Sequence, residues 1–134
     1  MYQESGIGYS PALIARRKKE ENLRSAQKVL DRAEVDAMNI LRSRFAPVWV
    51  RDIIKAAADD EGAHIGEVIG ESRRRDVVRA RHRAMYLIKA TKPGLSFPQI
   101  AKWFDRDHTS TIYAVAQYGL RNGLPAFTSS VGAR

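Results

Sequence analysis

The chain has 134 residues, the size of one domain, or of one small domain with an appendage. Its 23 Lys and Arg against 15 Asp and Glu give a formal net charge of +8, which favours polyanionic partners, nucleic acid before acidic membrane. There is no cysteine, so disulfides, thiolate metal sites and thiol nucleophiles are excluded. No apolar run approaches the roughly 20 residues of a membrane-spanning helix, and no signal-peptide pattern opens the chain, which predicts a cytoplasmic, nucleoid-associated protein.

Residues 1–46 predict an N-terminal helical extension. Ser10 and Pro11 form a helix start, and neither Gly nor Pro follows before Pro47. Apolar residues recur at helical spacing, at Leu23, Ala26, Leu30, Ala33, Ala37, Leu41 and Phe45. One helix of this length would be roughly 50 Å long, more than the width of a small domain. It therefore either breaks near Glu20–Asn22 or projects and finds a partner. Two roles stay open: self-association as a homodimer, and packing onto the domain that follows.

Residues 47–121 predict a domain of short helices. We expect helices from Pro47 to about Asp60, over His64 to Ile69, from Asp76 to about Ala90, from Ser96 to Phe104 and from about His108 to Tyr118. Ser96 and Gln99 form a capping box at the start of the fourth. In the last helix, Ile112, Val115 and Ala116 are expected to pack inward. Residues 122–134 lack periodicity and predict a disordered tail. Without strand alternation, the fold class is all-α.

The last two predicted helices, joined at Asp105–Arg106, are typical of a helix-turn-helix, whose second helix presents its first residues to base edges in the DNA major groove. Asp107, His108 and Thr109 occupy that position. A carboxylate accepts from the cytosine amino group, and a Thr methyl packs on the thymine methyl. The alternative for Asp107 is plain capping of the helix. Both roles are compatible, because a carboxylate has two oxygens.

A strongly basic stretch precedes this motif. Within 17 residues the chain carries Arg73, Arg74, Arg75, Arg79, Arg81, Arg83 and Lys89, opposed in sequence only by Asp76. Such a segment attracts phosphates, and the binding it supports weakens steeply with salt. Arg73, Arg74 and Arg75 precede the predicted helix, on backbone flexible enough to enter an AT-rich minor groove. The helix start at Ser96 and Pro98 offers free N–H groups to a phosphate, with plain capping as the alternative.

The segment from Val50 to Tyr118, and above all Arg106-Asp107-His108-Thr109, resembles the C-terminal DNA-binding domain (domain IV) of the bacterial replication initiator DnaA. The resemblance implies a helix-turn-helix of the Trp-repressor-like type. It also implies that Asp107, His108 and Thr109 contact major-groove bases of an AT-rich nonamer, the DnaA box, resembling TTATCCACA. Arg73 matches the family's minor-groove arginine best, with Arg74 and Arg75 as register alternatives. The positions that face phosphates in the family match Arg81, Lys89, Pro98 and Ser110.

Three features depart from that family. The turn Phe104-Asp105-Arg106-Asp107 is one residue shorter than the family's Phe-Gly-Gly-Arg-Asp and lacks its glycines. The family's Thr-Val-Leu-His is here Ser110-Thr111-Ile112-Tyr113. No Gly-x-x-x-x-Gly-Lys-Ser/Thr phosphate loop is present, so the ATPase module of the initiator is missing and no nucleotide is expected.

The sequence thus predicts a non-enzymatic, sequence-specific double-stranded DNA-binding protein that occupies DnaA-box-like sites and regulates transcription or replication initiation. A phage or prophage would suit such a stand-alone domain. We expect no catalytic residue, no cofactor and no metal, because His64 and His82 are isolated from other ligands. The alternative function is an adaptor that binds a replication or transcription protein and contacts DNA weakly and without sequence preference.

Overall fold

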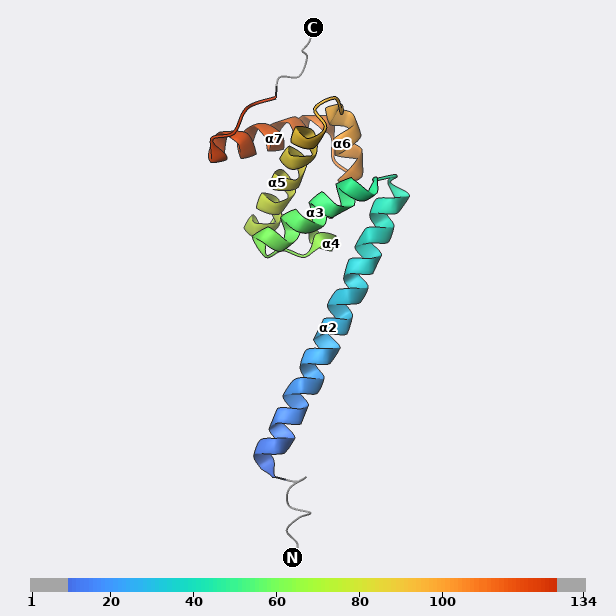
Figure 1. Cartoon of the computed structure of the whole chain (residues 1–134), viewed down its shortest axis with the longest axis vertical. Coiled ribbons are helices and arrows are strands. Elements are labelled where there is room, and N and C mark those ends of the chain that lie inside the picture. The colour runs from blue at the N-terminus through green and yellow to red at the C-terminus, as the bar shows by residue number, and fades with distance from the viewer. Residues whose placement is uncertain (1–9, 128–134) are drawn as a thin grey trace, which may run out of the picture. The chain divides into compact units, whose positions relative to one another are not determined.

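The computed structural model describes residues 10–127, and every regular element in that range is a helix (Figure 1). The all-α fold class is therefore confirmed. None of the helices in this range is long and apolar enough to cross a membrane. The chain divides into two compact units between Val35 and Asp36.

The first element, α2, spans Pro11–Ser43 as one helix, without a break at Glu20–Asn22. Its start is capped as expected, because the Ser10 hydroxyl accepts a hydrogen bond from the Leu13 N–H at 3.1 Å. The residues up to Val35 form the first unit, and the last turns belong to the second. There Ala37 and Leu41 are buried in the core. The division of the chain thus falls earlier than residue 46, where the sequence predicted it.

The second unit is built around α5 (Arg75–Thr91), which packs most extensively against α3 (Val48–Glu61) and α7 (His108–Asn122) (Figure 1). The short helix α4 (Ile65–Val68) lies against α3 and α5, and α6 (Phe97–Trp103) lies against α7. Wholly buried side chains fill the space between the helices: Leu41, Val50, Ile54, Val68, Val77, Met85, Ile88, Ile100 and Phe104. Burial of this apolar surface provides the main driving force for folding of the unit.

The inward face of α7 differs from the expected one. Thr111, Ala114, Val115 and Gly119 are buried, whereas Ile112 and Ala116 are exposed. The hydroxyl of Thr111 can be buried because it donates a hydrogen bond to the Asp107 carbonyl at 3.2 Å. The expectation for Val115 is confirmed and those for Ile112 and Ala116 are wrong, because a polar side chain with a local backbone partner took the inward position.

The C-terminal segment is ordered further than predicted. Helix α7 continues to Asn122 and ends at Gly123, which adopts the left-handed conformation with φ 62°. The Tyr86 hydroxyl then donates a hydrogen bond to the Pro125 carbonyl at 2.7 Å, and the Phe127 ring packs on Tyr86. The prediction of a disordered tail is therefore wrong for residues 122–127. Residues 128–134 lie outside the described part of the chain.

Candidate nucleic-acid interface

Helices α6 and α7 form the predicted helix-turn-helix, and their connection needs no glycine. The Ser96 hydroxyl accepts from the Gln99 N–H, and the Gln99 side chain in turn accepts from the Ser96 N–H, which completes the capping box of α6. At its other end the Arg106 N–H donates to the Ala101 carbonyl at 3.0 Å, with Asp105 between them at φ 52°. Aspartate tolerates this left-handed conformation better than most side chains. The shorter turn therefore still closes the motif.

Asp107 caps α7. One of its carboxylate oxygens accepts a hydrogen bond from the Ser110 N–H at 2.7 Å, and this bond is the main reason why the pKa of Asp107 lies below its usual value. The capping role is thus present. A carboxylate that binds one N–H through one oxygen retains acceptor capacity on the other.

The residues that follow Asp107 face outward. His108, Thr109 and Ser110 are all exposed, and within residues 10–127 no hydrogen bond engages the side chains of His108 or Thr109. They occupy the first turn of the second helix of the motif, where the N–H groups point toward a bound ligand and the helix dipole favours negative charge. This end of α7 can therefore approach another molecule closely.

The three arginines at the start of α5, Arg73, Arg74 and Arg75 (the basic loop), have different surroundings. Arg74 lies at the cap position of α5 and forms ion pairs with Asp76 at 3.1 Å and with Glu67 at 3.2 Å. Arg75 is the first residue of the helix, one residue earlier than predicted. Arg73 precedes the helix and is exposed, and no ion pair engages it in the described residues. Arg73 and Arg75, both exposed and outside these ion pairs, can therefore offer their charge to a ligand, and of the two only Arg73 precedes the helix.

Arg81 does not face solvent. Its side chain is only 5% exposed, and its guanidinium donates hydrogen bonds to the carbonyls of Glu67, Val68, Gly70 and Ser72 at 2.8–3.1 Å. Burial, reinforced by the charge of Arg106, lowers its pKa to about 10. Arg81 therefore supplies donors to carbonyls at the end of α4, and the prediction that it contacts phosphate is wrong.

Lys89 is buried in the same way. Its ammonium group donates to the carbonyls of Pro93 at 2.9 Å and Leu95 at 2.5 Å, and lies 4.6 Å from the centre of the Phe97 ring. Burial lowers its pKa. The phosphate prediction is wrong here too. The sequence did contain a signal, because Val77, Arg81, Met85 and Lys89 follow one another at four-residue spacing on the inward stripe of α5.

Two further arginines of α5 form ion pairs with acidic residues at the end of α3. Arg79 pairs with Glu61 at 3.2 Å, and Arg83 pairs with Asp60 at 3.0 Å. In the sequence only Asp76 opposed this stretch, because Asp60 and Glu61 lie well before it. A phosphate at Arg79 would have to compete with an exposed ion pair, which is worth little on its own.

Two arginines outside the basic stretch hold the motif in place, and no pattern in the sequence indicated them. Arg106, in the turn, donates to the Gly70 carbonyl at 2.9 Å, the same carbonyl that accepts from Arg81. Arg44 donates to the carbonyls of Ile69 at 3.3 Å and Trp103 at 2.9 Å. The segment before Arg73 is thereby tied to the turn before α7. The basic loop and the exposed end of α7 are held in one fixed arrangement.

His82 lies close to this arginine cluster. It is half-buried, and burial, followed by the charges of Arg121, Arg81 and Arg106, lowers its pKa from 6.5 to about 4. Between those values the unfolded chain binds a proton at His82 that the folded chain does not. Stability should therefore fall as the pH is lowered from 6.5 toward 4. We expect His82→Gln to reduce this loss, measured as urea midpoints at pH 7 and pH 4.5. An equal loss in both proteins would contradict the assignment.

Within the described residues, no group of three or more His, Cys, Asp and Glu side chains is arranged to hold a metal ion.

The comparisons agree with this geometry. A family model described as the bacterial dnaA protein helix-turn-helix matches residues 50–117. The chain is 37% identical over 102 residues to the chromosomal replication initiator protein DnaA of Oenococcus oeni, which covers 75% of this chain and 21% of the relative. It is 38% identical over 84 residues to the DnaA of Thermus thermophilus, with 59% and 19% covered.

A third relative is the DnaA of Picosynechococcus, 37% identical over 76 residues, with 56% of this chain and 17% of the relative covered. The chain thus spans about a fifth of the length of these relatives. No solved structure matches it. The matched residues run from α3 into α7 and take in α6, the turn and the first part of α7, and the protein therefore belongs to the bacterial dnaA protein helix-turn-helix family.

Proposed function

We propose that this protein is a non-enzymatic, sequence-specific double-stranded DNA-binding protein. The observation that carries the proposal is the exposed first turn of α7, where His108 and Thr109 have no hydrogen-bond partner within the described residues, in a member of this family. A helix-turn-helix places that turn against base edges in the major groove. Asp107 would accept from a cytosine amino group through the oxygen that does not cap the helix.

The surrounding polar residues would hold the backbone of the duplex. Arg73 is the strongest candidate for the minor groove, since Arg74 is held by two ion pairs and Arg75 lies within the helix. Ser110, Pro98 and Ser96 are exposed at helix starts, where phosphates bind favourably. Arg79 would add a weaker contact. Arg81 and Lys89 take no part, since their side chains already donate hydrogen bonds to backbone carbonyls.

The target we propose is a site similar to the DnaA box, and the role is regulation of replication initiation or transcription. The named relatives are chromosomal replication initiators, and this chain matches about a fifth of their length. Occupation of such sites by this chain would compete with an initiator that binds the same sites.

The test is a binding measurement with two fluorescent duplexes of equal composition, one carrying TTATCCACA and one with that sequence scrambled, over a range of salt concentrations. We expect affinity for both to fall with salt, because phosphate contacts release counterions. We expect the matched duplex to be preferred by more than about tenfold at every salt concentration. Equal affinity for both would reject the DnaA box as the target. Selection from random duplexes would then show whether another sequence is preferred, and a selection that enriches no sequence would reject sequence-specific binding.

The second candidate function is an adaptor that binds a replication or transcription protein. Exposed apolar side chains on α2 favour it, including Leu23 at 62% exposure and Leu30 at 50%. The same side chains would serve a homodimer. In either case α2 is the surface, and equal affinity for matched and scrambled duplexes would favour the adaptor.

A further inference from the structure

Residues 67–72 run from the end of α4 to the basic loop, and arginines from three other parts of the fold hold them in place. Arg81 of α5 donates hydrogen bonds to the carbonyls of four of these residues. Arg44, which follows α2, donates to one carbonyl of the segment at 3.3 Å. Arg106, in the turn before α7, donates to the Gly70 carbonyl at 2.9 Å. The backbone that leads into the basic loop is therefore fixed from three directions.

The hydrogen bond from Arg106 joins two parts of the protein that are 36 residues apart in the chain. Gly70 lies three residues before Arg73, and Arg106 lies two residues before His108. Arg81 holds the same segment to α5, whereas Arg106 itself belongs to the turn that leads into α7. Its bond therefore connects the exposed arginine of the basic loop to the exposed first turn of α7 through only a few residues on either side.

Glycine is required at the accepting end of this bond. A Cβ atom at Gly70 would lie 3.0 Å from the Gly66 carbonyl oxygen, which is closer than nearly all side-chain carbons approach another atom. Only glycine allows the chain to pass this close to α4 while its own carbonyl accepts from both Arg81 and Arg106. The local backbone is thus shaped around the connection to the turn.

The charges of these arginines are not neutralised by carboxylates. None of the ion pairs within residues 10–127 involves Arg44, Arg81 or Arg106. Arg81 and Arg106 also repel each other, because both donate to the same carbonyl. Apolar side chains could hold the two segments together without this repulsion. What the Arg106 guanidinium adds is a planar donor of fixed geometry, which defines the separation of two outward-facing surfaces.

We propose that Arg106 is a positioning residue: its bond to Gly70 fixes the separation between Arg73 and the first turn of α7, and so the number of base pairs between the minor-groove and major-groove contacts. The inference rests on the proposed function, in which both surfaces contact one duplex. Two contacts on a rigid support form together only where the DNA presents them at the matching separation. A flexible support tolerates several separations and binds each more weakly.

The first test measures this separation in the full chain without DNA. Because the chain has no cysteine, nitroxide labels can be attached at two exposed positions through Glu71→Cys and Thr109→Cys. Electron paramagnetic resonance then gives the distribution of distances between the two labels. We expect one narrow distribution with Arg106 present and a broader one after Arg106→Ala. A distribution that is broad from the start, or that Arg106→Ala leaves unchanged, would overturn the proposal.

Arg106→Gln is a second variant for the same measurement, and it keeps a polar side chain with a similar stem. The amide nitrogen of glutamine ends where the Nε atom of arginine lies, so it cannot reach the Gly70 carbonyl. The distribution should therefore broaden as it does with alanine. Circular dichroism verifies for both variants that the helices are retained.

The second test uses the matched duplex and a series of duplexes with one base pair inserted at each step of TTATCCACA in turn. For the wild type we expect the most damaging insertion to weaken binding at least about tenfold, because one of the two contacts is then lost. For Arg106→Ala we expect weaker binding to the matched duplex and a penalty for that insertion of about threefold or less. If Arg106→Ala weakened binding to all duplexes by one factor and kept the full penalty, Arg106 would be a phosphate contact and the proposal would be wrong.

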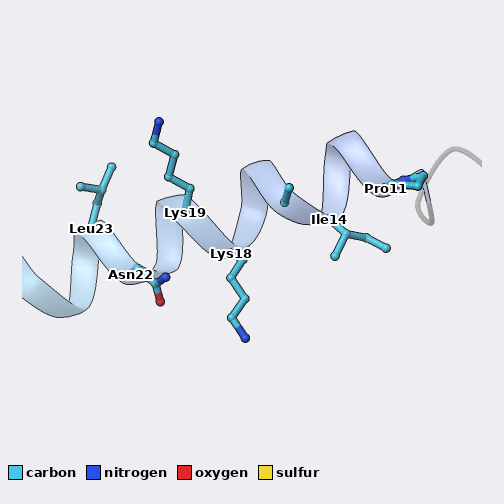
Figure 2. Close-up of a pocket in the computed structure, with 7 residues that line it drawn as sticks. Pro11, Ile14, Lys18, Lys19, Asn22 and Leu23 are labelled. Atoms are coloured by element: carbon cyan, nitrogen blue, oxygen red, sulfur yellow. The ribbon is translucent and has the colours of Figure 1, made fainter.

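Two control variants remove one positive charge away from this connection. Arg121→Ala removes an exposed arginine in the last turn of α7. Lys19→Ala removes an exposed lysine of the first unit, whose side chain projects away from α2 (Figure 2). Within residues 10–127 no hydrogen bond or ion pair engages either side chain. Both variants should leave the label distances and the insertion penalty unchanged.

The two tests separate this inference from the proposed function. If the wild type prefers the matched duplex but Arg106→Ala keeps the narrow distances and the full penalty, sequence-specific binding stands and the positioning role fails. If the distances broaden but the wild type prefers no sequence, Arg106 holds the loop to the turn and the proposed function fails.

Discussion

Replacing Arg81 with alanine is expected to lower the free energy of unfolding by about 3–5 kcal/mol, because four buried or half-buried carbonyls lose their donor at once. Small domains are stable by only about 5–15 kcal/mol, so the variant should be largely destabilised. Lysine should not rescue it, because one ammonium group cannot reproduce the planar fork of donors that reaches these carbonyls. Urea unfolding followed by circular dichroism measures the effect.

Arg79→Ala is the control on the same helix. Arg79 is exposed and pairs with Glu61, so its loss should cost about 1 kcal/mol or less. A surface phosphate contact at Arg81 would predict the opposite result: normal stability, a weaker affinity for every duplex and a shallower dependence on salt. Normal stability of Arg81→Ala would therefore show that its hydrogen bonds to the carbonyls contribute nothing.

Replacing His108 or Thr109 with alanine is expected to weaken binding to the matched duplex by about 1–3 kcal/mol, which is roughly 5- to 150-fold, with no change for the scrambled duplex. Both side chains are exposed, so stability should stay within about 0.5 kcal/mol of the wild type. Fluorescence anisotropy with both duplexes gives the two affinities, and the discrimination against single base changes should fall most at the contacted position.

Asn122→Ala is a matched control, since Asn122 is exposed at the opposite end of α7 from His108. It should leave both affinities unchanged. If His108→Ala and Thr109→Ala kept the full preference for the matched duplex, the first turn of α7 would not lie in the major groove, and sequence preference would have to arise from the basic loop.

Local chemistry made most of the fold predictable. Ser96 and Gln99 specify the start of α6, Gly62 ends α3, and Asp107 caps α7, each through neighbours a few residues away. The helix-turn-helix could be located for the same reason, and so could the exposure of His108 and Thr109 at its second helix. The end of α7 was less predictable, because Gly119 is buried within the helix and Gly123 ends it.

The sequence by itself therefore determined an all-α chain with an N-terminal helical extension and a helix-turn-helix near its end, because capping, helical periodicity and helix-breaking residues act over a few positions. It left open whether the extension breaks near Glu20–Asn22, and the structure shows one helix there. Only the tertiary structure decided which basic residues are exposed to a ligand and which are hydrogen-bonded inside the protein. Arg81 and Lys89 carry the same charge as Arg73, but they lie on the inward stripe of α5, where carbonyls from α4 and from the loops that follow α4 and α5 meet them. Arg44 and Arg106 are positioned by carbonyls up to 59 residues away in the chain. Composition gives the number of charges, but the carbonyls that bind them come close only when the helices pack together.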